Sequence, residues 1–111
     1  MSIHPVSELA ALNSSTLGTV MPEVSLPDGT RVQTGTVGAL LLNIKAYNQA
    51  HASDNQGQMR SLRSALQAAI PLLTKVGMFE LFPPEDWIRG DNEGRQMVGR
   101  MAIEFQQPRE I

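Results

Sequence analysis

Two amphipathic segments in the middle of the chain restrict its fold more than any other feature of the sequence. In residues 36–50 and 58–75, apolar side chains recur every three or four positions, which places them along one face of an α-helix. The apolar positions are Val37, Leu40, Leu41, Ile44 and Tyr47 in the first segment and Met59, Leu62, Leu66, Ala69, Ile70 and Leu73 in the second. We therefore predict two long helices with apolar faces that must be covered.

The ends of these helices carry recognisable signals. Thr34 or Thr36 is placed to cap the first exposed amides of the first helix. In the second helix, Pro71 has no amide hydrogen and its ring crowds the preceding turn, so we predict a kink or an early stop there. Gly77 is a natural carboxy-terminal cap, and Lys75 precedes it where the helix dipole favours a positive charge.

Residues 23–34 have the pattern of a β-hairpin. Apolar and polar residues alternate on both sides of a Pro-Asp-Gly turn at residues 27–29. A two-stranded hairpin is only marginally stable by itself. We therefore expect its apolar face, formed by Val24, Leu26 and Val32, to pack on a helix, for which residues 36–50 are the nearest candidate.

The two ends of the chain are predicted to be helical in part. Residues 7–12 form a short helix, and residues 13–18 a loop, because their small polar side chains compete for backbone hydrogen bonds. For the N-terminal arm, residues 1–20, the sequence leaves open mobility or docking on a second subunit. A last helix is expected over residues 92–105, capped by Asp91 or Asn92.

These elements define the predicted fold class. We expect a mostly helical α+β protein in which one β-hairpin packs on three to four helices. A chain of 111 residues is a common single-domain size. It contains no internal repeat and no long linker, so residues 1–111 are predicted to form one domain.

Composition excludes several chemistries. The chain has no cysteine, which rules out disulfides, thiolate nucleophiles and cysteine-based metal sites. The net charge of −2 disfavours binding to nucleic-acid backbones and to anionic lipid. The longest apolar run is far too short to cross a bilayer, and residues 1–5 do not resemble an export signal. We expect a soluble, cytoplasmic protein that does not bind membranes.

No residue pattern points to catalysis. The two histidines, His4 and His51, lie far apart in the sequence, so a metal site would have to assemble from remote parts of the chain. An acidic cluster comprises Glu80, Glu85, Asp86, Asp91 and Glu93. Carboxylates beside prolines, glycines and helix starts are usually solvated or capping. We predict no metal and no cofactor, and the catalytic residues, if any, are unknown.

The densest aromatic segment is the strongest candidate for partner binding. Met78, Phe79, Phe82 and Trp87 lie within ten positions, and aromatic residues are enriched at protein interfaces. The competing interpretation is that so small a domain needs these side chains in its core, in which case Trp87 would be buried. Two further candidates, Arg60 and Arg63, share a helix face that could meet an acidic partner, or could simply be solvated.

The leading functional hypothesis is a non-enzymatic protein that acts by self-association, as a homodimer, or by binding a protein partner, through residues 78–87 and an adjoining helix face. The alternative is a small-molecule binder or enzyme with a pocket between the hairpin and the helices, using Arg31, Tyr47, Arg89 or the acidic residues as polar contacts. Nucleic-acid binding through Arg60 and Arg63 is a third hypothesis, which requires retention on polyanions that weakens with salt.

Overall fold

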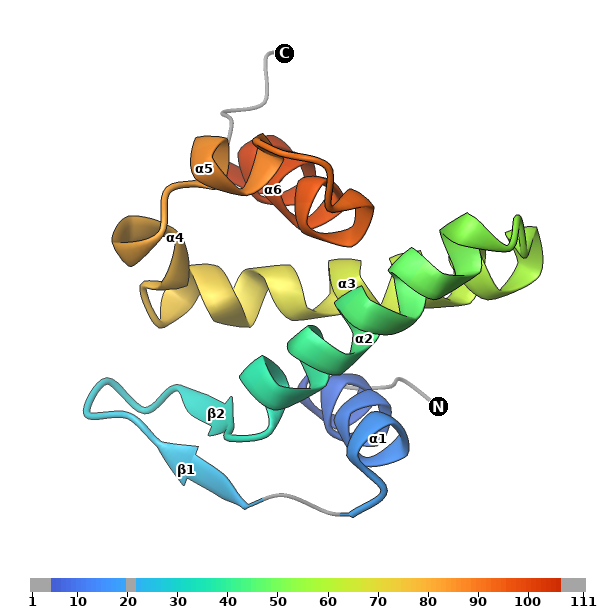
Figure 1. The fold of residues 1–111 in the computed structure, drawn as a ribbon. Coiled ribbons are helices and arrows are strands. Elements are labelled where there is room, and N and C mark those ends of the chain that lie inside the picture. The colour runs from blue at the N-terminus through green and yellow to red at the C-terminus, as the bar shows by residue number, and fades with distance from the viewer. Residues whose placement is uncertain (1–4, 20–21, 107–111) are drawn as a thin grey trace, which may run out of the picture.

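The computed structural model describes residues 5–19 and 22–106 (Figure 1). Its elements, in chain order, are α1 (Pro5–Leu17), β1 (Glu23–Ser25), β2 (Arg31–Gln33), α2 (Thr36–Ala52), α3 (Gln56–Lys75), α4 (Met78–Leu81), α5 (Pro84–Ile88) and α6 (Glu93–Gln106). The predicted fold class is confirmed: the protein is a mostly helical α+β domain with one antiparallel hairpin.

Helix α3 is the centre of the packing. In Figure 1 it crosses the middle of the molecule, with α5 and α6 on one side and α1 and the hairpin on the other, while α2 crosses it. The predicted apolar face of this helix forms the core, since Leu66, Ile70 and Leu73 are almost completely buried. Leu40 from α2 and Val98 from α6 complete this centre. Burial of each such side chain stabilises the fold by roughly 1.5–3 kcal/mol.

Helix α3 does not stop early at its proline. It continues to Lys75, with Pro71 inside it, so the predicted early stop is wrong. Pro71 lies on the exposed face, and the neighbouring Ile70 is buried in the core, so tertiary packing outweighs the lost hydrogen bond. The helix ends where predicted, because Gly77 adopts a φ of 92°, a conformation that favours glycine.

The first helix is longer than predicted. Residues 13–17 continue α1 instead of forming a loop, so this prediction is wrong. The reason is tertiary: the Asn13 side chain is buried and donates to the Thr36 hydroxyl at 2.9 Å, and the Thr16 hydroxyl donates to Asn43 at 3.2 Å. These polar side chains bond to α2 and therefore do not compete with the backbone of their own helix.

The hairpin has the predicted strands but a different buried face. Val24 pairs with Val32 across the two strands. However, Val24 is 47% exposed, and the buried side chain of the hairpin is Gln33, so the expected apolar face is wrong in part. The Gln33 amide donates to Glu23 at 2.8 Å, which satisfies the buried polar group. Strand β2 packs mainly against α1, whereas we expected the hairpin to pack on α2.

The predicted N-terminal cap is wrong for α2 and correct for α6. Neither threonine caps α2: Thr36 is its first residue and donates its hydroxyl to the carbonyl of Gln33 at 3.0 Å, while the Thr34 hydroxyl donates to Pro22. For α6 the prediction is confirmed, because the Asn92 side chain accepts from the Arg95 amide at 2.9 Å.

Candidate functional site

A groove of about 330 Å³ lies where the first half of α2 faces α4, α5 and α6. It is lined by Val37, Leu40, Leu41, Met78, Phe82, Trp87 and Arg95. Six of these seven residues are apolar. We call this feature the α2–α6 groove.

The predicted aromatic segment is divided between the core and this groove. Phe79 is buried and makes an edge-to-face contact with Trp87, with ring centroids 5.6 Å apart. Trp87 is 8% exposed, so it is buried, and its indole N–H donates to the Phe82 carbonyl at 2.9 Å. Phe82 itself is 52% exposed, and Met78 is half-buried in the groove wall. Phe79 and Trp87 therefore belong to the core, and Trp87 also forms part of the groove lining.

The exposed wall of the groove is apolar. Leu41 is 61% exposed and Val37 is 42% exposed, both on α2, and Phe82 faces them from the segment after α4. Isolated exposed apolar residues are ordinary, but several around one groove make it a candidate interaction site. Contact with another apolar surface would bury these three side chains, which is energetically favourable.

Among the described residues, Arg95 is the one charged side chain that lines the groove. The guanidinium of Arg95 lies 6.0 Å from the centre of the Trp87 ring, a distance at which a cation interacts favourably with the π face. Among residues 5–19 and 22–106, Arg95 has no ion-pair partner. The groove therefore combines an apolar surface with one positive charge available to a carboxylate.

The basic pair predicted on α3 does not belong to this groove. Arg60 and Arg63 are exposed in the first half of α3, whereas α4 follows the other end of the helix. With a rise of 1.5 Å per residue, Arg63 and Lys75 are separated by about 18 Å along the helix axis. The structure thus does not bring the arginine pair together with the aromatic segment.

The residues considered for catalysis are scattered. His51 lies 3.9 Å from Glu93, with both side chains partly exposed, and Asp86 pairs with Arg89 at 3.4 Å. His4 lies outside the described residues. Within the part of the chain that the structure describes, no three histidine or acidic side chains gather where they could hold a metal ion. Likewise, none of the described helices is both long and apolar enough to span a membrane.

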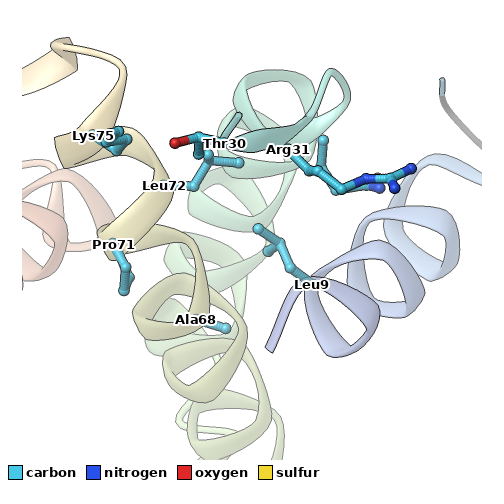
Figure 2. Close-up of a pocket in the computed structure, with 8 residues that line it drawn as sticks. Leu9, Thr30, Arg31, Ala68, Pro71, Leu72 and Lys75 are labelled. Atoms are coloured by element: carbon cyan, nitrogen blue, oxygen red, sulfur yellow. The ribbon is translucent and has the colours of Figure 1, made fainter. Parts of the chain in front are cut away.

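A second hollow, of about 230 Å³, lies between the hairpin, α1 and α3 (Figure 2). It is lined by Leu9, Thr30, Arg31, Gln33, Ala68, Pro71, Leu72 and Lys75. We call it the hairpin pocket. Of the polar contacts proposed for a ligand pocket, Arg31 lines it, whereas Tyr47 is buried in the core and Arg89 is exposed and paired elsewhere.

Four of the seven groove residues are not among the site candidates that the sequence indicates. Val37, Leu40 and Leu41 lie on the broad apolar face predicted for α2, and Arg95 is the fourth residue. Helical spacing separates only Leu41 from the buried stripe formed by Leu40, Ile44 and Tyr47: Leu41 lies about 60° beyond Ile44, whereas Val37 lies within about 20° of it. No comparable signal marks Arg95 in the sequence.

Together these observations describe a small helical α+β domain with an exposed apolar groove. A family model described as "Domain of unknown function (DUF7709)" matches residues 7–106. The chain therefore belongs to this family. A comparison with curated proteins and a comparison with solved structures gave no match.

Proposed function

We propose that this protein is a non-enzymatic binding module whose α2–α6 groove holds an apolar, helical segment of a partner protein. The observation that carries the proposal is the set of exposed apolar side chains around one groove, with Leu41 and Phe82 each more than half exposed. A surface of this kind is costly to leave in water and is characteristic of interaction sites.

The groove favours an amphipathic helix as the partner segment. Helices that bind in grooves insert apolar side chains spaced three, four and seven positions apart. Three apolar anchors would match the exposed surface of Val37, Leu41 and Phe82. Each anchor contributes roughly 1.5–3 kcal/mol when it is fully buried, and burial of the exposed side chains of the groove itself adds to what offsets the entropy of association.

Arg95 supports a partner segment that carries an acidic residue. Its guanidinium lies at the groove. A carboxylate on the partner could form an ion pair with it without breaking an existing ion pair among the described residues. Charged contacts of this kind contribute more to specificity and association rate than to affinity. The pair should strengthen binding by a factor of about two to five and should weaken with salt.

A peptide selection tests this proposal. The full-length protein is used to select from a library of helical peptides of about 14 residues with leucine at helical spacing and glutamate, glutamine or lysine beside the leucines. Glutamate should be enriched. The selected peptide should bind Arg95→Gln about two- to fivefold more weakly, and Arg100→Gln, an exposed arginine on the same helix, with unchanged affinity. Enrichment of lysine, or equal effects of the two variants, would contradict the proposal.

Self-association through the same groove is the alternative, and light scattering distinguishes it. The protein alone should remain a monomer up to micromolar concentrations. A doubled mass that Leu41→Asp abolishes and Leu42→Asp preserves would assign the groove to a second copy and overturn the choice of a different partner. Leu42 is a matched control because it is 48% exposed on the same helix and does not line the groove.

A further inference from the structure

The hairpin pocket has an apolar floor. Ala68, Pro71 and Leu72 line it from α3, and Leu9 lines it from α1. Figure 2 shows Leu9 and Leu72 on facing sides of the hollow, with Thr30 above them. An apolar surface of this shape suits the hydrocarbon part of a small molecule.

The volume of the pocket sets the size of its ligand. A closed apolar cavity of about 150 Å³ is enough to hold benzene. The hairpin pocket, at about 230 Å³, is larger and partly open to solvent. It therefore fits a short aliphatic chain or a single substituted ring whose polar end can reach water.

The charged side chains that line the pocket are positive, and each of them pairs with a carboxylate of the hairpin. Within the part of the chain that the structure describes, the lining contains two cations, Arg31 and Lys75, and no carboxylate. In Figure 2 the Arg31 side chain extends away from Lys75, and its guanidinium pairs with Glu23 in the hairpin. Lys75 is therefore the cation better placed to meet the polar end of a ligand.

Lys75 already binds a carboxylate. Its ammonium group lies 2.8 Å from Asp28, in the hairpin turn, and both side chains are about half exposed. Exposed ion pairs are weak, so a ligand carboxylate whose hydrocarbon part is buried in the pocket can compete with Asp28. The position of the Asp28 carboxylate shows that there is room for a carboxylate beside the Lys75 ammonium group.

We propose that the hairpin pocket binds a small monocarboxylate with an apolar body, whose carboxylate replaces Asp28 on Lys75. This site is separate from the α2–α6 groove and does not depend on the function proposed for the groove. Hydrocarbon burial supplies most of the affinity, and Lys75 selects the anion over neutral and cationic molecules of the same length.

Titrations with octanoate, octanol and octylamine test this proposal, with amide chemical shifts as the readout on the full-length protein. Octanoate should bind most tightly, by about three- to tenfold over octanol, and should shift the amides of Thr30, Leu72 and Lys75. Lys75→Met should reduce octanoate binding to the level of octanol. Lys45→Met, which changes an exposed lysine outside the pocket, should leave both affinities unchanged.

Asp28→Asn should strengthen octanoate binding, whereas Lys75→Met should weaken it. Asp28→Asn keeps an oxygen that can accept the Thr30 amide hydrogen but removes the charge that competes for Lys75. Octanoate should therefore bind more tightly than to the unsubstituted protein, by about two- to fivefold, while octanol binding is unchanged. A merely structural role of the ion pair would instead weaken the binding of both molecules.

Filling the pocket gives the final control. Ala68→Leu should abolish binding of all three molecules while thermal unfolding shows that the protein remains folded. Equal binding of octanoate and octanol, or octanoate binding that survives Ala68→Leu, would overturn the proposal. Octanoate binding that Leu41→Asp abolishes would overturn it too, by placing the ligand in the α2–α6 groove.

Discussion

The side-chain oxygen of Asn48, on α2, accepts a hydrogen bond from the backbone amide of Gly94, in the first turn of α6, at 2.7 Å. The Asn48 amide group also donates to the Asn92 side chain at 3.0 Å, and Asn92 in turn caps α6. Helix α2 thus supplies part of the N-terminal cap of α6, which is distant from it in the sequence. This contact positions the start of α6, and with it Arg95, beside the α2–α6 groove.

Asn48→Ala should therefore destabilise the protein. The substitution leaves the Gly94 amide without its acceptor, and the loss of a cap of this type costs about 0.5–2 kcal/mol. Urea unfolding measures the change in the free energy of unfolding. Gln49→Ala is the control, because Gln49 is exposed on the same helix and its side chain makes no hydrogen bond among those found in the described residues. Equal stability of Asn48→Ala and the unsubstituted protein would show that the contact is energetically unimportant.

Gly99→Ala should also destabilise the protein, although alanine favours helices. A Cβ atom at Gly99 would lie 2.8 Å from the Pro84 carbonyl oxygen and 2.9 Å from the Trp87 Cβ, which is closer than real contacts allow. Such overpacking costs about 1–3 kcal/mol, against a gain of about 1 kcal/mol in helix propensity.

The matched control for this glycine is Gly38→Ala. Gly38 is exposed in α2, and the nearest atom to an added Cβ, on Leu17, lies at an ordinary 3.6 Å. This substitution should stabilise the protein by up to about 1 kcal/mol. If Gly99→Ala and Gly38→Ala shift the free energy of unfolding in the same direction, the close approach of α5 and α6 at Gly99 is not what governs the effect of the added methyl group.

Phe79 and Phe82 should respond very differently to truncation. Phe79→Ala removes a buried ring that packs on Trp87 and should cost about 3–5 kcal/mol. Phe82→Ala removes a half-exposed ring and should cost less than about 1 kcal/mol, while it weakens peptide binding. Chemical denaturation of both variants, followed by peptide titration of Phe82→Ala, checks this division. Similar losses of stability would place both rings in the core.

The ion pair of Asp28 should make stability depend on acid pH. The Lys75 ammonium group, followed by the hydrogen bonds from Thr30, holds the pKa of Asp28 well below its usual value of 3.8. Because the folded state lowers this pKa, the stabilising contribution is present above the unfolded-state value and is lost as the pH falls toward the folded-state value.

A comparison of the unsubstituted protein with Asp28→Asn measures this effect. Their difference in unfolding free energy should be constant from neutral pH to about pH 5 and should shrink below the usual pKa. Since the pair is exposed, the difference should also decrease in high salt. Lys75→Met should reduce the same pH dependence. A difference that grows on acidification would have the wrong sign for this ion pair.

The sequence predicts the helices and the hairpin well because their signals are local. Apolar spacing identifies α2, α3 and α6, and the turn at residues 27–29 identifies the hairpin. The errors arise where tertiary contacts, rather than the local sequence, determine whether a helix continues. Asn13 remains helical because Thr36 bonds to its side chain, and Pro71 remains inside α3 because the core contributed by other helices buries the adjacent Ile70.

The candidate site could be predicted only in part for the same reason. The aromatic segment is visible in the sequence, but the division of Phe79 from Phe82 depends on the direction of a four-residue helix. Arg95 reaches the groove because α6 packs beside α2, which brings together residues more than fifty positions apart. Neither relationship has a signal in local spacing.

The most direct test of the proposed function is the dissociation constant of the selected glutamate peptide for Leu41→Asp and Leu42→Asp, measured side by side. Both substitutions place a charge at an exposed leucine of α2, and only Leu41 lines the groove. We predict that Leu41→Asp weakens binding by about tenfold or more and that Leu42→Asp has no effect. Equal affinities for the two variants would contradict binding in the α2–α6 groove.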